Sequence, residues 1–243
     1  MKRLMMLCCV MLTIAGTAAG MIPFAKSDSL PEKLKYSTVE RPITASSFIL
    51  PGALFGAGAT LTFAQSATHH LDSTTQGEIH EDMPGFRTAV DNFLQFAPAV
   101  AVFGLNAAGV KGRHTMLQAT EYYIVAFLVM AGTTEVLKTA THVQRPDQSD
   151  YKSFPSGHTA NAFMGAEFLH QEYGHRSVWY SAAGYTTATA TGLLRMTNNR
   201  HWLGDVVAGA GIGILSTRFS YWLVPRINKA IQKDKHPPII LKF

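Results

Sequence analysis

Apolar residues gather in six stretches along the chain, and polar segments separate these stretches. They run approximately over residues 47–65, 92–110, 117–137, 157–172, 178–194 and 205–224. Each has a helix-like composition, rich in Ala, Leu, Phe and Met, and none alternates apolar and polar residues with the period of two typical of a half-buried strand. The pattern predicts an all-α fold, a single bundle of about six core helices.

The stretches only partly meet the requirements of membrane spans. A span needs about 20 mostly apolar residues. The stretch 92–110 comes close to this, whereas Glu121, Glu135 and Glu167 fall within two of the other stretches. Several of the six would therefore be weak spans.

Basic residues predict an orientation for such spans and also raise a conflict. The positive-inside rule places Lys111, Arg113 and the basic residues after the last stretch in the cytoplasm. The loop after the third stretch and the start of the fourth then lie outside, but residues 21–46 lie inside, which a cleaved export signal forbids. Either the first stretch, interrupted by Pro51 and glycines, does not cross, or the domain lies in or on the periplasmic side. The basic residues after the last stretch are Arg226, Lys229, Lys233 and Lys235.

The first 20 residues read as a secretory signal, with a basic start, an apolar run from Leu4 to Ala15 and small residues near a cleavage point at Ala19 or Gly20. An uncleaved anchor helix is the alternative. Both cysteines, Cys8 and Cys9, fall in this segment, so cleavage would leave no thiol for a disulfide or a metal site. We expect an exported protein of the bacterial cell envelope.

The rest of the chain divides into a polar arm over residues 21–45, a helical domain over 46–226 and a basic tail over 227–243. Charged residues make up 15% of the chain, against roughly 25% in an average soluble domain. The net charge of +5 favours acidic partners. Lys and Arg are scattered without a dense patch of interleaved aromatic residues, which argues against nucleic acid.

A long polar segment, residues 66–91, separates the first two stretches and is expected to be an excursion or a short surface helix. It holds a group of residues that could suggest a metal site, but their spacing fits no strong ligand pattern, so we interpret the group as a solvated loop. These residues are His69, His70, His80, Glu81 and Asp82.

Three clusters of reactive side chains stand at predicted helix boundaries. One follows the third stretch, one opens the fourth, and one precedes the last, so the six-helix arrangement places all three at one end of the bundle. The clusters are Lys138 with Arg145 and Pro146; Pro155, Ser156, Gly157 and His158; and Arg195 with His201 and Asp205.

Gathered together, these side chains would form a site for phosphoryl transfer. Two guanidinium groups and an ammonium can hold phosphate oxygens, together with the amides of a helix N-terminus. His201 and Asp205 are four residues apart and share a helix face, so the carboxylate can fix the tautomer and leave the other ring nitrogen as a nucleophile. His158 is suited to protonating a leaving alkoxide.

Each cluster alone also has an ordinary interpretation. Lys138 and Arg145 would serve as interface anchors, the Pro155–His158 turn as a helix cap, and His201 with Asp205 as a surface pair. Coincidence would then have to explain all three clusters at the same end of the bundle.

The three clusters resemble the pattern of the type 2 phosphatidic acid phosphatase and vanadium haloperoxidase superfamily, K-x6-R-P, P-S-G-H and S-R-x5-H-x3-D. The resemblance covers about residues 90 to 225. The sequence departs from the pattern once, with Leu194 where Ser is usual, which could loosen the support around Arg195.

The resemblance implies a metal-independent phosphatase that works through a phosphohistidine at His201, with Asp205 orienting the ring and His158 protonating the departing oxygen. Lys138, Arg145, Arg195, the Ser156 hydroxyl and the Gly157 amide would hold the phosphate. No metal or other cofactor is expected, because the cations take the place of a metal.

The expected substrate is a lipid phosphate at a membrane surface, because charge is scarce and aromatic residues lie near the ends of the stretches. Candidates are lipid A, polyprenyl pyrophosphate, phosphatidic acid and phosphatidylglycerophosphate. The alternatives are a soluble periplasmic acid phosphatase of broad specificity, a vanadium haloperoxidase, and a non-enzymatic membrane protein with a relic pocket. The aromatic residues are Tyr122, Tyr123, Trp179, Trp202 and Trp222.

Overall fold

The protein is a bundle of helices, and the part of the chain that the structure describes contains no strand. The computed structural model describes residues 43–64 and 67–235. The expected export signal, nearly all of the polar arm and the last eight residues lie outside these ranges. The elements are η2 (Ala45–Phe48), α3 (Ile49–Phe63), α4 (Ala67–Asp82), α5 (Val90–Leu94), α6 (Ala97–Ala107), α7 (Met116–Thr141), α8 (Gly157–Tyr173), α9 (Val178–Thr197) and α10 (Leu203–Lys235).

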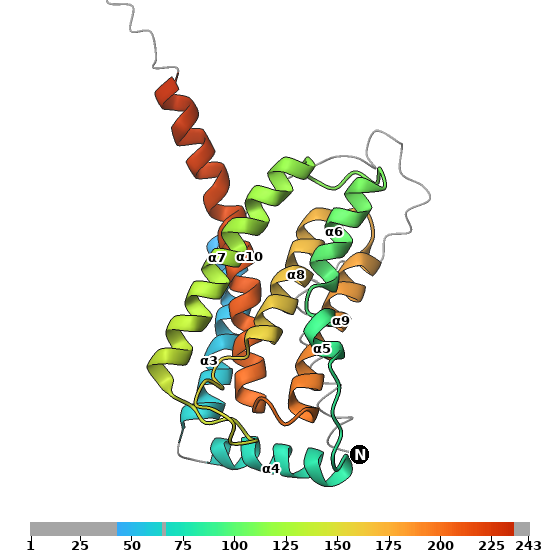
Figure 1. Ribbon diagram of the computed structural model, residues 1–243. Coiled ribbons are helices and arrows are strands. Elements are labelled where there is room, and N and C mark those ends of the chain that lie inside the picture. Colours follow the sequence, from blue (N-terminus) through green and yellow to red (C-terminus); the bar gives the residue numbers. More distant parts are fainter. Residues whose placement is uncertain (1–42, 65–66, 236–243) are drawn as a thin grey trace, which may run out of the picture.

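Six apolar helical segments run side by side, as the hydrophobic pattern predicts (Figure 1). The all-α bundle is thereby confirmed. The second stretch is divided into α5 and α6, and Pro98 lies in the first turn of α6, where its missing N–H costs no intrahelical bond. The last helix continues to Lys235, well into the segment expected as a basic tail.

Helix α8 forms the centre of the bundle, and nearly every one of its residues is buried. Glycines on α10 allow α8 to approach closely. A Cβ at Gly213 would lie 2.2 Å from the carbonyl oxygen of Ala160, and one at Gly209 would lie 2.6 Å from that of Ser156. The buried Glu167 of α8 pairs with Arg218 of α10, Oε1 to Nε at 2.9 Å. The glycines thus allow close packing at the start of α8, and the ion pair holds the middle of α8 against α10.

Helix α4 crosses one end of the bundle (Figure 1). The interpretation of its His, Glu and Asp residues as a loop was wrong, because they belong to a 16-residue helix. Its inward face combines the core residue Ile79 with two polar residues that bond to the backbone at the end of α9 and the start of α10. Asp72 accepts from the Gly204 amide at 3.1 Å and Gln76 donates to the Met196 carbonyl at 3.0 Å. Free backbone groups at helix ends can pair with buried polar side chains. The hydrophobic pattern of the sequence does not reveal such pairs.

Two helices of the described residues are long and apolar enough to cross a membrane, the continuous segment Ala45–Phe63 and Met116–Thr141. Both leave large apolar side chains exposed, among them Ile49, Leu117 and Leu128. Pro51 does not interrupt the first segment, since it lies in the first turn of α3. Their length and exposed apolar surface favour contact with a membrane but do not by themselves establish it.

Candidate active site

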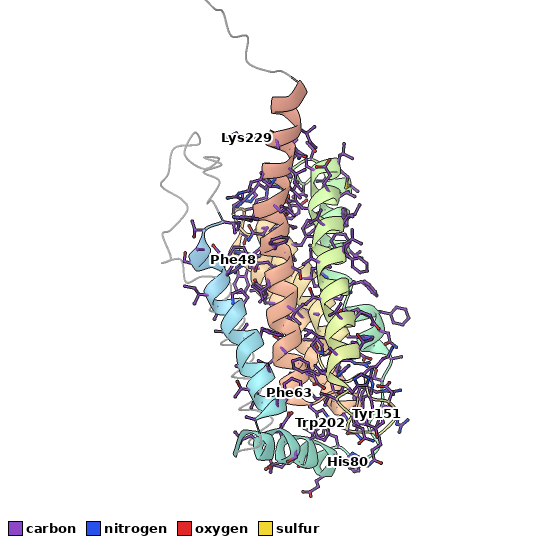
Figure 2. All side chains as sticks on the ribbon, turned by 90° about the vertical axis from the view of Figure 1, so that its left-hand side faces the viewer. Phe48, Phe63, His80, Tyr151, Trp202 and Lys229 are labelled. Carbon is purple, nitrogen blue, oxygen red and sulfur yellow. The ribbon has the colours of Figure 1, made fainter. Side chains whose placement is uncertain are left out.

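All three sequence clusters lie at the end of the bundle that α4 covers. Figure 2 shows Tyr151, from the connection between α7 and α8, beside Trp202, from the connection between α9 and α10. The indole of Trp202 donates to the Gln144 carbonyl at 2.8 Å, so the two connections are bonded to each other. The sequence prediction that the clusters share one end of the bundle agrees with this geometry.

His201 lies between Arg145 and Asp205 with 1% of its surface exposed. The Arg145 Nη1 atom is 3.3 Å from His201 Nε2. A guanidinium can only donate, so Nε2 carries a lone pair and the ring proton is on Nδ1. That proton points toward Asp205, whose Oδ2 atom is 3.4 Å from Nδ1. Burial, and after it the positive charge of Arg195, holds the pKa of His201 well below its usual value, so the ring is neutral at neutral pH.

Asp205 is fully buried, and this burial raises its pKa to about 6. Two hydrogen-bond donors stabilise the ionised carboxylate and offset part of this rise in pKa. The Ser153 hydroxyl donates to Oδ2, and the Trp202 amide donates to the same oxygen at 3.0 Å. Asp205 is therefore mainly ionised at neutral pH, the form that accepts from the His201 ring. Ser153 is a contact that the sequence patterns did not single out.

Arg145 and Lys138 converge on one backbone carbonyl. The Lys138 Nζ atom donates to the Lys152 oxygen at 3.0 Å, and Arg145 Nη2 reaches the same oxygen at 3.4 Å. Asp150 accepts from Arg145 Nε at 2.7 Å, which orients the guanidinium toward His201. The connection between α7 and α8 thus fixes the positions of both cations through its own backbone and a carboxylate.

Arg195 is supported from a segment that the motifs do not contain. Its Nη1 atom donates to Asp91 Oδ2 of α5 at 2.6 Å, and both side chains are buried. Leu194, where the family pattern has Ser, leaves this support intact. The only signal in the sequence was the polar pair Asp91 and Asn92 at the start of an apolar stretch, which is too weak to assign a role.

His158 contacts the same short helix. Its Nε2 atom lies 2.9 Å from Asn92 Oδ1, so Nε2 carries a proton in this contact. Burial, and after it the charge of Arg195, lowers the pKa of His158 to about 4. The imidazole is therefore neutral at neutral pH unless a negative charge binds beside it.

Ser156 and Gly157 form the N-terminus of α8. Ser156 is the N-cap, and its oxygen accepts from the Thr159 amide at 3.4 Å and contacts the Thr159 hydroxyl at 2.9 Å. The Gly157 amide belongs to the first turn, where amides have no intrahelical acceptor. A Cβ at Gly157 would lie 3.9 Å from Lys138 Cε, so the helix start and the lysine are neighbours.

An open cavity of about 490 Å³ lies beside these groups. Arg145, His158 and Arg195 line it, together with Arg87 and Arg200, which the motifs do not include. Three aspartates also line it, and each forms an ion pair with one of these arginines: Asp91 with Arg195, Asp147 with Arg200 and Asp150 with Arg145. The described residues contain no group of three or more His, Cys, Asp or Glu side chains placed to hold a metal ion. His201 lies behind this cavity, in contact with its lining residue Arg145, and the arginines of the lining suit a phosphorylated ligand.

Comparison with known proteins agrees with this geometry. The family model described as PAP2 superfamily matches residues 119–229, the segment that carries all three motifs. A protein named Lipid A 1-phosphatase, from Porphyromonas gingivalis, is 38% identical over 167 residues, which are 67% of this chain and 37% of that protein. The chain thus spans little more than a third of the length of this relative.

A crystal structure of Aquifex aeolicus LpxE aligns with 59% of this chain and 92% of its own chain, at 22% identity and a TM-score of 0.45. The ordered motifs, the family match across them and the relative's sequence together assign residues 119–229 to the PAP2 superfamily.

Proposed function

We propose that this protein is a phosphatase that removes phosphate from a lipid through a phosphohistidine at His201. The observation that carries the proposal is the contact of Arg145 Nη1 with His201 Nε2 at 3.3 Å. It presents an unprotonated ring nitrogen next to a guanidinium, and a phosphate bound to that guanidinium brings its phosphorus to the nitrogen.

In the first step the Nε2 lone pair forms a bond to phosphorus while the bond from phosphorus to the ester oxygen breaks. His158, made cationic beside the bound phosphate, gives its proton to the departing oxygen. The ring of His201 becomes positively charged, and Asp205 stabilises that charge through the Nδ1 proton. The leaving group departs as an alcohol.

In the second step His158, now neutral, accepts a proton from water as the water oxygen attacks phosphorus. The bond from phosphorus to Nε2 breaks, and inorganic phosphate is released. Charge gathers on the equatorial oxygens in both steps, where the cations and the amides of the α8 N-terminus stabilise it. The groups assigned to this task are Lys138, Arg145, Arg195, the Ser156 hydroxyl and the Gly157 amide.

The substrate proposed is a phosphorylated lipid at a membrane, with lipid A as the first candidate. Support comes from the name of the relative, Lipid A 1-phosphatase, and from the exposed apolar faces of α3 and α7. We further propose that the site faces the periplasm and that the domain extends over residues 46–226, behind an export signal or anchor.

The test is phosphate release by protein purified with and without detergent, on a panel of lipid phosphates and on p-nitrophenyl phosphate. We expect lipid hydrolysis in detergent, inhibition by vanadate, and loss of turnover in His201→Ala. Retention of more than about a tenth of the wild-type rate by that variant would exclude His201 as the nucleophile. Activity confined to the small ester in a detergent-free fraction would support the soluble acid phosphatase instead, and vanadate-dependent bromide oxidation the haloperoxidase.

A further inference from the structure

A second cleft lies at the opposite end of the bundle from the candidate active site, where α7 begins and α10 extends beyond the other helices (Figure 1). Its volume is about 320 Å³, and its lining includes Arg113, His114, Tyr122, Trp222 and Arg226. The 26 residues of α7 separate the two ends by about 39 Å at 1.5 Å per residue, so this cleft has no part in the proposed hydrolysis.

The cleft has a net positive charge, because two arginines line it and the one buried carboxylate beside it, Glu172, is hydrogen-bonded to other groups. Glu172 accepts from His114 at 2.7 Å through Nδ1 and at 3.0 Å through the amide, and from the Tyr221 hydroxyl at 2.5 Å. Within the described ranges, neither Arg113 nor Arg226 forms an ion pair with a carboxylate. The two guanidinium groups therefore give the cleft a net attraction for anions.

Aromatic side chains form the wall of the cleft and hold one of its cations in place. The Arg226 guanidinium lies over the Trp222 ring at 4.1 Å from the centroid. Tyr122 of α7 and Tyr221 of α10 stack at 4.2 Å. Arg226 Nη1 donates to the Trp222 carbonyl. This bond and the stacking orient the guanidinium and leave its other N–H groups available to a ligand.

An apolar groove of about 220 Å³ lies between η2, α7 and α10. One of its lining residues, Phe219, stacks on Trp222 of the cleft with the ring centroids 5.7 Å apart. Seven residues of α7 separate Tyr122 in the cleft from Val129 in the groove, a distance of about 10 Å. The groove is lined by Phe48, Val129, Thr133, Ile212, Leu215, Ser216 and Phe219.

We propose that the cleft and the groove together bind one anionic phospholipid, with its phosphate between Arg113 and Arg226 and an acyl chain along the groove. The positive-inside rule puts this basic end in the cytoplasmic leaflet. That leaflet is rich in anionic lipid, and basic pockets between helices on this side hold phosphorylated headgroups. The site is separate from the one that the proposed function uses.

The test measures binding of phosphatidylglycerol by the full chain in phosphatidylcholine nanodiscs, with retained lipid counted by native mass spectrometry. The variant R113Q/R226Q removes both cleft cations, and K111Q/K229Q removes two charges from the same end of the bundle without touching the cleft. We expect about tenfold weaker binding for the first pair and less than about twofold for the second. Hydrolysis at the other end should be unchanged in both and reports that they fold.

Equal weakening in both pairs would overturn the proposal, because it would show attraction to surface charge alone. Wild-type protein that binds phosphatidylglycerol no better than phosphatidylcholine would overturn it as well. Displacement of the lipid by millimolar inorganic phosphate would identify a site for free anions rather than for a lipid. Should R113Q/R226Q fail to fold, Leu215→Trp, which fills the groove, is expected to weaken binding about fivefold, and unchanged binding would contradict an acyl chain there.

Discussion

At the scale of single residues, the proposed chemistry depends on the protonation states of His201, His158 and Asp205. His201 holds its proton on Nδ1 toward Asp205, and His158 holds one on Nε2 toward Asn92. Burial favours the neutral form of all three side chains. The reactive state, with Asp205 ionised and His158 protonated, is therefore a minor state of the unliganded protein, and pH controls its population.

The pH dependence of kcat/KM is expected to be bell-shaped with a broad maximum between about pH 4 and pH 6. His158 must be protonated, and its pKa is about 4, so the rate falls about tenfold per unit above pH 6. Asp205 must be ionised, and its pKa is about 6, so the rate falls in the same way below pH 4. Initial rates at low substrate concentration over pH 3–9 measure both limbs.

Asp205→Asn serves as the control for this profile. It should be slow but should keep the alkaline limb, since His158 still titrates, and it should lose the acidic limb. An optimum near pH 8 in the wild type would contradict the assignment of His158 as the proton donor.

Asn92→Asp should shift the pKa of His158 upward by about one to two units and so raise kcat/KM above pH 6 about ten- to a hundredfold. A carboxylate at the position of Asn92 Oδ1, 2.9 Å from His158 Nε2, stabilises the imidazolium and raises its pKa. The same rate profile measures the shift. Asn92→Leu, which can neither accept nor carry charge, should lower kcat without an upward shift. If the two variants behave alike, Asn92 acts only through packing.

The sequence predicted the site residues that belong to local patterns and missed those that do not. His201 with Asp205, and Ser156 with Gly157, are recognised because helix geometry joins neighbours in the chain. Asp91 of α5 contacts Arg195 across 104 residues. No periodicity relates such a pair, so its partnership follows only from the packing of α5 against α9.

At the scale of elements, α10 depends on glycine where it contacts α8. Gly213→Ala should lower the thermal unfolding midpoint and cost about 1–3 kcal/mol. A Cβ there would lie 2.2 Å from the Ala160 carbonyl oxygen and 2.7 Å from the Met164 amide nitrogen. Both are helix backbone atoms, so only a shift of α8 against α10 can relieve the contact.

Gly132→Ala in α7 is the matched control, because a Cβ there would meet nothing within 4 Å. Alanine should stabilise the helix by up to about 1 kcal/mol, so the two substitutions are expected to act in opposite directions. Thermal unfolding in detergent compares them directly. Equal unfolding midpoints for the two variants would contradict the close packing of α10 against α8 at Gly213.

Element boundaries were predicted well where hydrophobicity alone decides them and poorly where polar contacts do. Helices α7 to α9 match their stretches closely, whereas α10 continues past the end of its stretch to Lys235. Helix α4 was not recognised as a long helix, since its inward residues Asp72 and Gln76 are polar. Their partners are backbone groups at the end of α9 and the start of α10. The division between α5 and α6 could not be located from apolar content, because both sides of it are equally apolar.

At the scale of the whole molecule, the two ends of the bundle differ in charge and in chemistry. One end holds the candidate active site, and the other holds Arg113, Arg226 and the proposed lipid cleft. Figure 2 shows Phe63, the last residue of α3, at the active-site end and Phe48 farther toward the other. Helix α7 also ends at the active-site end, after beginning beside the cleft, so α3 and α7 run in the same sense between the two ends. A membrane orientation derived from one of them can be checked against the other.

This orientation predicts which positions a membrane-impermeant thiol reagent reaches in intact spheroplasts. In a background with Cys8 and Cys9 replaced by Ser, Tyr151→Cys should be labelled, since Tyr151 is 56% exposed at the end proposed to face the periplasm. Lys111→Cys, at the basic end, should be labelled only after permeabilisation. Labelling of both positions in intact spheroplasts would mean that the bundle lies on the outer surface of the membrane. The reverse pattern would place the site in the cytoplasm and would rule out a periplasmic substrate.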